Sequence, residues 1–235
     1  NYIDAARITR QDKERYNRMI ASKLRDEAVT PHNALEEKTC RLLDMILTAY
    51  EGSARKKIME TLLELLEAQN NSIRQQKTPL TEAQILEISI RKGSTSVLAD
   101  YLFAATDWRE YEENFYLKFG FLLQLVDDLQ DIEEDRNAGS QTLMTGAESR
   151  QQLEQYTNRL LWFSWHVIRD FEPVNPGLKG FVLKHCVEIS LLTAAANQQF
   201  FSREYLKALE TYLPFSLDFL KKMKKQMLQS RQKMS

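Results

Sequence analysis

Glycine and proline are scarce in this chain, with only 7 and 5 among its 235 residues. Both residues interrupt helices and build the tight turns of sheet proteins, so their scarcity favours long, unbroken helices. Apolar residues recur at helical spacing, and no segment shows the strict apolar–polar alternation that predicts a strand. We therefore expect an all-α protein, a single-domain bundle of about eight helices.

Cysteine is rarer still, and neither sign of charge is in excess. Cys40 and Cys186 have no neighbour at metal-binding spacing, which favours buried thiols of a reducing compartment over a disulfide framework. The formal net charge of -1 gives no electrostatic reason to expect a nucleic-acid partner. No apolar run reaches the roughly 18 residues that a membrane-spanning helix needs, and no signal peptide is evident. The sequence thus predicts a soluble, cytoplasmic protein without a transmembrane segment.

Capping and turn residues divide the chain into the expected helices. The first helix follows Thr9, whose side chain is a good N-cap. Later helices are expected to begin near Pro31, Ser53, Thr81, Thr106 or Asp107, Ala147, Pro176 and Ser202. No internal repeat or linker is visible, so residues 1–235 are predicted to form one helical domain. The chain starts at Asn1 without an initiator methionine, and we leave open that N-terminal helices of this domain precede it.

Residues 120–135 form the most informative stretch, predicted to be one continuous helix. One of its faces carries polar, mostly acidic side chains: Gln124, Asp127, Asp131 and Glu134, with Asp128 and Asp135 at its edge. Aspartate is a poor helix-interior residue, and like charges four residues apart destabilise a helix, so this stack implies a use. Carboxylates at this spacing suit Mg²⁺, which takes one or two of them and leaves its other positions to water and phosphate oxygens. Spacing alone leaves a metal site and a solvated acidic face as alternatives.

The order of residues in this stretch, Gly-x-x-x-Gln-x-x-Asp-Asp-x-x-Asp at 120–131, resembles a known motif. It is similar to the second aspartate-rich motif of trans-isoprenyl diphosphate synthases, which belong to the class I isoprenoid (terpenoid) synthase superfamily. The resemblance implies an isoprenoid synthase-like bundle whose central cavity binds a prenyl diphosphate through Mg²⁺. It implies that Asp127 and Asp131 are catalytic metal ligands. Asp128 would be an auxiliary metal ligand, and Gln124 a substrate-binding wall of the cavity.

A lysine one helix earlier fits the same family. Lys92 shares a helix face with small residues, which leaves room for its ammonium in a cavity, although a solvated lysine is the alternative. Gly93 within a helical pattern costs about 1 kcal/mol relative to alanine, which indicates a kink or close packing. Prenyl synthases carry a Lys-Thr pair at this place, and the resemblance implies that Lys92 binds diphosphate and acts in catalysis, with Gly93 replacing the threonine.

Other parts of the family pattern are weak or missing. Gln69 lies where those enzymes have a glutamine that faces the prenyl chain, so the resemblance implies a substrate-binding role for it. The first aspartate-rich motif is not in this chain. Asp4 matches its last aspartate, a metal ligand, and Arg7 and Arg10 match the substrate-binding cations that follow it. The missing motif leaves catalytic competence open.

The resemblance predicts a Mg²⁺-dependent prenyltransferase that ionises an allylic prenyl diphosphate. Ionisation needs positive charge around the leaving diphosphate and a dry pocket around the carbocation. Aromatic candidates for that pocket near the motif are Tyr101, Phe103, Phe115 and Phe119. The alternatives are a terpene cyclase, a squalene/phytoene synthase-like enzyme, which residues 124–135 match less completely, and a non-catalytic prenyl-diphosphate-binding or regulatory relative. A helical interaction module also stays open, and the family resemblance implies a homodimer.

Overall fold

The computed structural model describes residues 9–105, 107–173 and 176–223. This part of the chain contains nine α-helices with defined bounds, two short 3₁₀ helices, a further helical stretch at 217–223 and no strand, so the all-α prediction is confirmed. The α-helices are α1 (Arg10–Leu24), α2 (Ala34–Thr48), α3 (Gly52–Ser72), α4 (Glu82–Ala104), α5 (Glu110–Gln130), α6 (Ile132–Ala138), α7 (Arg150–Arg169), α8 (Pro176–Ala196) and α9 (Arg203–Glu210). The 3₁₀ helices are η1 (Ile73–Gln76) and η2 (Gln198–Phe200). Among these residues no helix is both long and apolar enough to cross a membrane.

Side-chain caps fix several helix starts where the sequence predicted them. The hydroxyls of Thr9, Thr81 and Ser202 each accept a hydrogen bond from a backbone N–H in the first turn of the following helix. Thr81 belongs to a complete capping box with Gln84, so two otherwise unpaired donors at the start of α4 are satisfied. The second helix begins later than expected, because Asn33 caps it.

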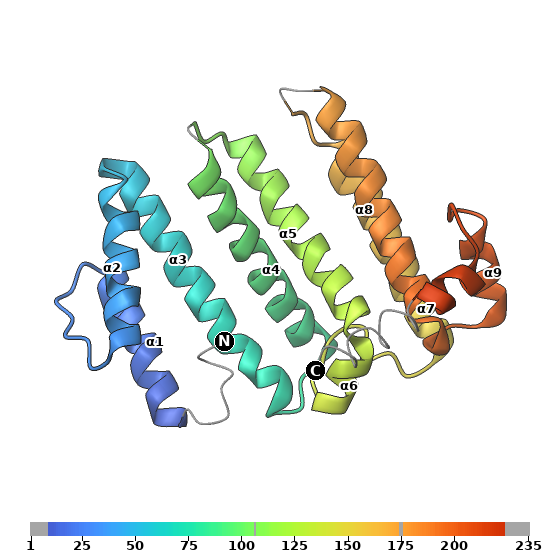
Figure 1. Cartoon of the computed structure of the whole chain (residues 1–235), viewed down its shortest axis with the longest axis horizontal. Helices are drawn as coiled ribbons and strands as arrows, with labels where there is room; N and C mark the ends of the chain where they lie inside the picture. The colour runs from blue at the N-terminus through green and yellow to red at the C-terminus, as the bar shows by residue number, and fades with distance from the viewer. Residues whose placement is uncertain (1–8, 106, 174–175, 224–235) are drawn as a thin grey trace.

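The helices are arranged around a central layer. Figure 1 shows α3, α4 and α5 side by side, with α2 beyond α3 and α8 beyond α5. Helices α7 and α8 pair with each other and both pack against α5, while α1 packs against α2 and α3. The main hydrophobic core therefore lies where α5 meets α7 and α8, and fully buried leucines such as Leu122, Leu129 and Leu160 fill it.

The acidic helix is not continuous, which corrects the prediction for residues 120–135. Helix α5 ends at Gln130, Asp131 forms the joint, and α6 continues from Ile132. The side-chain amide of Asn197, at the end of α8, donates to the backbone oxygens of Leu129 at 2.8 Å and Gln130 at 3.2 Å. A side chain that takes helix carbonyls in this way interrupts the regular hydrogen-bond ladder. The break is therefore stabilised by a distant residue.

Candidate functional site

Two glycines bring α4 and α5 into backbone contact. A Cβ atom added at Gly93 would overlap the carbonyl oxygen of Gly120, and one added at Gly120 would overlap the carbonyl oxygen of Gly93. Ser94 strengthens the crossing, because its hydroxyl donates to the backbone oxygen of Leu117 at 2.6 Å. Helix α4 runs through Gly93 without a break, so the glycine serves close packing and makes no kink.

The crossing places Lys92 opposite the carboxylates of α5 and α6. Burial raises the pKa values of Asp127, Asp128 and Asp135, and the nearby positive charge of Lys92 opposes the rise at each of them. In the part of the chain that the structure describes, Lys92 makes no direct ion pair with any carboxylate. Lys92 is half-buried. It lies beside an acidic row, which consists of Asp127, Asp128, Asp131 and Asp135, and no single carboxylate of that row neutralises its charge. The diphosphate hypothesis needs a cation near these carboxylates, and the role of Lys92 in it stays a prediction.

Opposing effects act on the aspartates of this row. Partial desolvation raises the pKa of Asp127, the charge of Asp131 raises it further, and Lys92 lowers it. The pKa of Asp135 is raised by the same two causes in the same order. The negative charges of the row therefore disfavour one another, because Lys92 compensates them only in part. A cation placed among them would relieve this repulsion.

Asp128 is the buried member of the row, with 4 % of its surface exposed. Gln124 donates to its Oδ1 at 2.7 Å, whereas its Oδ2 is buried and has no hydrogen-bond partner among the described residues. Burial raises the pKa of Asp128 to about 7, although Gln124 and Lys92 oppose the shift. Gln124 is thus engaged by Asp128, and the predicted role of Gln124 as a free substrate-binding wall becomes that of a support for this carboxyl.

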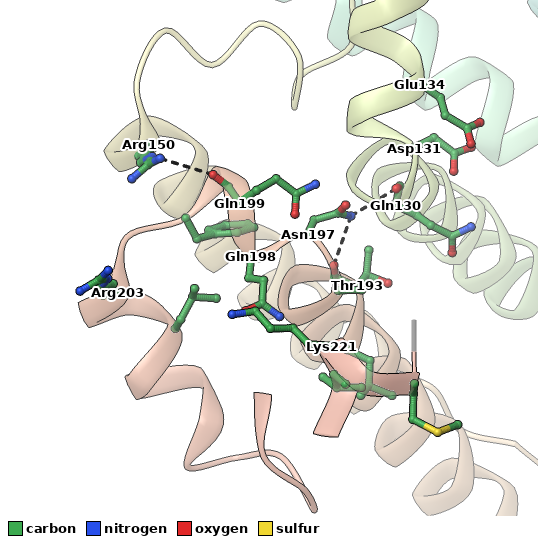
Figure 2. Close-up of a pocket in the computed structure, with 16 residues that line it drawn as sticks. Gln130, Asp131, Glu134, Arg150, Thr193, Asn197, Gln198, Gln199, Arg203 and Lys221 are labelled. Carbon is green, nitrogen blue, oxygen red and sulfur yellow. Dashed lines mark hydrogen bonds between the residues drawn. The ribbon is translucent and has the colours of Figure 1, made fainter. Parts of the chain in front are cut away.

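The acidic face of α5 and α6 is more exposed to solvent than the resemblance implies. Asp127 is exposed, and Asp131 and Asp135 are half-buried. The C-terminal end of the face meets a large cavity, of about 1190 Å³, which Asp131 and Glu134 line together with α8 and α9 (Figure 2). The expectation that Asp127 would face a closed central cavity is therefore wrong for the described residues, because no described helix covers the solvent side of α5 at Asp127.

The predicted Mg²⁺ site can have only a few protein ligands among the described residues. Among the described residues no group of three or more histidine, cysteine, aspartate or glutamate side chains converges as a metal-binding cluster. A Mg²⁺ ion with one or two carboxylates and several waters needs no such cluster. Asp127 and Asp131 are one helical turn apart, and Asp135 follows Asp131 at the same spacing, so hard oxygen donors of the right type are present.

The other predicted site residues are not joined to this row. Asp4 and Arg7 lie outside the described residues, and Arg10 begins α1 but its side chain is not described. Gln69 is exposed on α3, where its backbone oxygen accepts from Ser72. None of the described contacts links Gln69 to Lys92.

The aromatic residues suggested for the hydrocarbon pocket belong to other parts of the molecule. Phe115 is buried and stacks on Phe171 with ring centroids 3.9 Å apart, and it also stacks on Phe119. Tyr101 is buried against Tyr116, and Phe103 is partly exposed. These rings stabilise the core at the start of α5, so they do not form a pocket beside the carboxylates.

Asn197 is the functional candidate that sequence reasoning missed. It is buried, it holds the joint at Asp131 through the two carbonyls described above, and it lines the cavity of Figure 2. The available signal was a polar residue directly after the small-residue run at 194–196, where a helix end packs closely.

Comparisons with family models, with curated proteins and with solved structures found no match.

Proposed function

We propose that this protein binds a prenyl diphosphate through Mg²⁺ and ionises it, as an isoprenoid synthase-like enzyme. The observation that carries the proposal is the placement of Lys92 beside the aspartates of α5 and α6, across a backbone contact that needs glycine on both helices. This juxtaposition joins the two motifs in which the sequence resembles prenyl synthases, at 92 and at 120–131. The proposal therefore rests on the resemblance together with this proximity.

Each residue has a defined task in this proposal. Asp127 and Asp131 offer oxygen ligands one turn apart, and Mg²⁺ bound there would neutralise charge that develops on the leaving diphosphate. Lys92 contributes a second positive charge that is not consumed by an ion pair. Asp128 is supported by Gln124 and presents one buried oxygen without a partner, which suits an auxiliary ligand. Its raised pKa means that cation binding would release a proton near neutral pH.

A second candidate function is diphosphate binding without catalysis. The exposure of Asp127 favours it, because a carbocation needs shielding from water and the described residues give this part of the face none. Both candidates require the same metal and diphosphate site, and they differ in whether the carbon–oxygen bond is broken.

Binding is tested by thermal denaturation with Mg²⁺, with pyrophosphate and with both. Ligands that bind only the folded state raise the melting temperature by mass action, and a shared ion makes the combined shift larger than the sum of the separate shifts. Asp127→Asn should remove this synergy. Asp100→Asn is the matched control, since Asp100 is an exposed aspartate of α4 outside the row. Synergy that survives in Asp127→Asn would overturn the site.

Catalysis is tested by pyrophosphate release from geranyl and farnesyl diphosphate in Mg²⁺. Release that wild type shows and that Lys92→Met and Asp127→Asn lose supports the enzyme. Synergistic binding without any release would select the second candidate.

A further inference from the structure

Apolar side chains form much of the wall of the cavity of about 1190 Å³ beside the α5–α6 joint (Figure 2). Its apolar residues are Leu192, Ala196, Phe201, Leu206, Leu220 and Met223. They come from α8, from Phe201 just before α9, from α9 itself and from the chain that follows α9, so separate segments meet around one cavity. Concave apolar surface with few polar groups is typical of small-molecule sites, whose volumes usually run from about 300 to 1,000 Å³.

Charge is separated across this cavity. Arg150 and Arg203 lie on one side, and Asp131 and Glu134 on the other (Figure 2). Lys221 adds a third cation to the lining. Arg150 donates to the backbone oxygen of Gln199 at 3.4 Å. Neither arginine nor Lys221 forms an ion pair with a carboxylate within the described ranges.

We propose that this cavity binds a single-chain anionic amphiphile, with its headgroup on the side of Arg150 and Arg203 and its chain on the apolar wall. The unpaired cations attract the headgroup, and Asp131 and Glu134 repel it from the opposite end, so the ligand has one preferred direction. The volume of about 1190 Å³ lies slightly above the usual range for small-molecule sites, so it has room for a chain of about a dozen carbons. This site differs from the proposed metal site in the groups that would bind the anion, although Asp131 borders both.

The test uses the full chain in EDTA, so that the metal site cannot contribute. Calorimetry measures binding of dodecanoate, dodecyl phosphate, octanoate and dodecyltrimethylammonium below their micelle concentrations. Both twelve-carbon anions should bind saturably, and octanoate at least about tenfold more weakly, because each buried methylene favours binding. The ratio between the two anions distinguishes a carboxylate from a phosphate as the natural headgroup. Equal affinity for the twelve-carbon cation would overturn the proposal.

Variants then locate the site. Arg203→Gln should weaken dodecanoate binding about tenfold, the loss expected for one charge-assisted contact. Lys207→Gln is the matched control, because Lys207 is an exposed cation on the same helix that does not line the cavity. Ala196→Phe should fill the cavity and remove binding. Equal effects of Arg203→Gln and Lys207→Gln, or full binding by a folded Ala196→Phe variant, would refute this location.

Discussion

Replacement of Asp128 by asparagine should change how the stability of this protein depends on pH. The side chain is 4 % exposed, and its pKa rises from 3.8 to about 7 on folding. A carboxyl with a raised pKa is favourable when protonated, so its stabilising contribution is complete below pH 3.8 and is lost as the pH rises through 7. Asparagine has the same shape and behaves as a carboxyl that never ionises.

The size of this effect follows from the two pKa values. Their separation corresponds in full to about 4 kcal/mol, at about 1.4 kcal/mol for each pH unit. Between pH 5 and pH 8, linkage assigns Asp128 a loss of about 2–3 kcal/mol in the free energy of unfolding. Asp128→Asn should remove this loss, so the variant should be more stable than wild type at pH 8, and its advantage should be about 2–3 kcal/mol smaller at pH 5.

Urea denaturation in EDTA at half-unit steps between pH 5 and pH 8 measures the effect without interference from metal ions. Asp100→Asn, which changes an exposed aspartate of α4, should follow the wild-type curve. If Asp128→Asn keeps the wild-type pH dependence, the carboxyl is not the strained group that its burial indicates.

Three further substitutions test other parts of the structure. Lys92→Met should change the free energy of unfolding by no more than about 1 kcal/mol, because a partly exposed lysine adds little to folding. It should weaken pyrophosphate binding in Mg²⁺ about tenfold, because the ammonium can make a charge-assisted contact. Unchanged calorimetric affinity would remove Lys92 from the site. Gly93→Ala should destabilise by about 1–3 kcal/mol through overpacking against α5. Gly180→Ala in α8, where a Cβ meets no atom within 4 Å, should instead stabilise by up to about 1 kcal/mol in the same urea assay. Asn197→Ala should lower the free energy of unfolding by about 1–3 kcal/mol, because it leaves buried carbonyls unpaired. Gln199→Ala, at an exposed position, should lower it hardly at all. Equal losses in the two variants would contradict the role of Asn197.

Local sequence signals predicted much of the fold. The caps at Thr9, Thr81 and Ser202 were predictable because each involves a side chain and the backbone amide three residues further on. The break at Asp131 was not predictable, because the amide that stabilises it lies 68 positions from Leu129 in the chain. A local pattern carries no information about such a partner.

The candidate site shows the same division. Helical periodicity correctly grouped Asp127 and Asp131 on one face, and the cost of a mid-helix glycine pointed to close packing at Gly93, which the structure confirms. Periodicity does not say which element covers a face, so the exposure of Asp127 could not be foreseen. The cavity beside Asp131 was also beyond prediction, since its walls come from segments that are distant in the sequence.

The contact between Gly93 and Gly120 has a mechanical consequence. Most helix pairs touch through side chains, which can change rotamer and let the helices slide or separate slightly. Here backbone meets backbone, so the spacing between α4 and α5 has almost no adjustable part. Helices α4 and α5 should therefore move as one rigid unit, which keeps Lys92 and Asp127 at a fixed separation. Any adjustment to a ligand is then left to the joint at Asp131, where α5 has already ended and a single amide holds the chain.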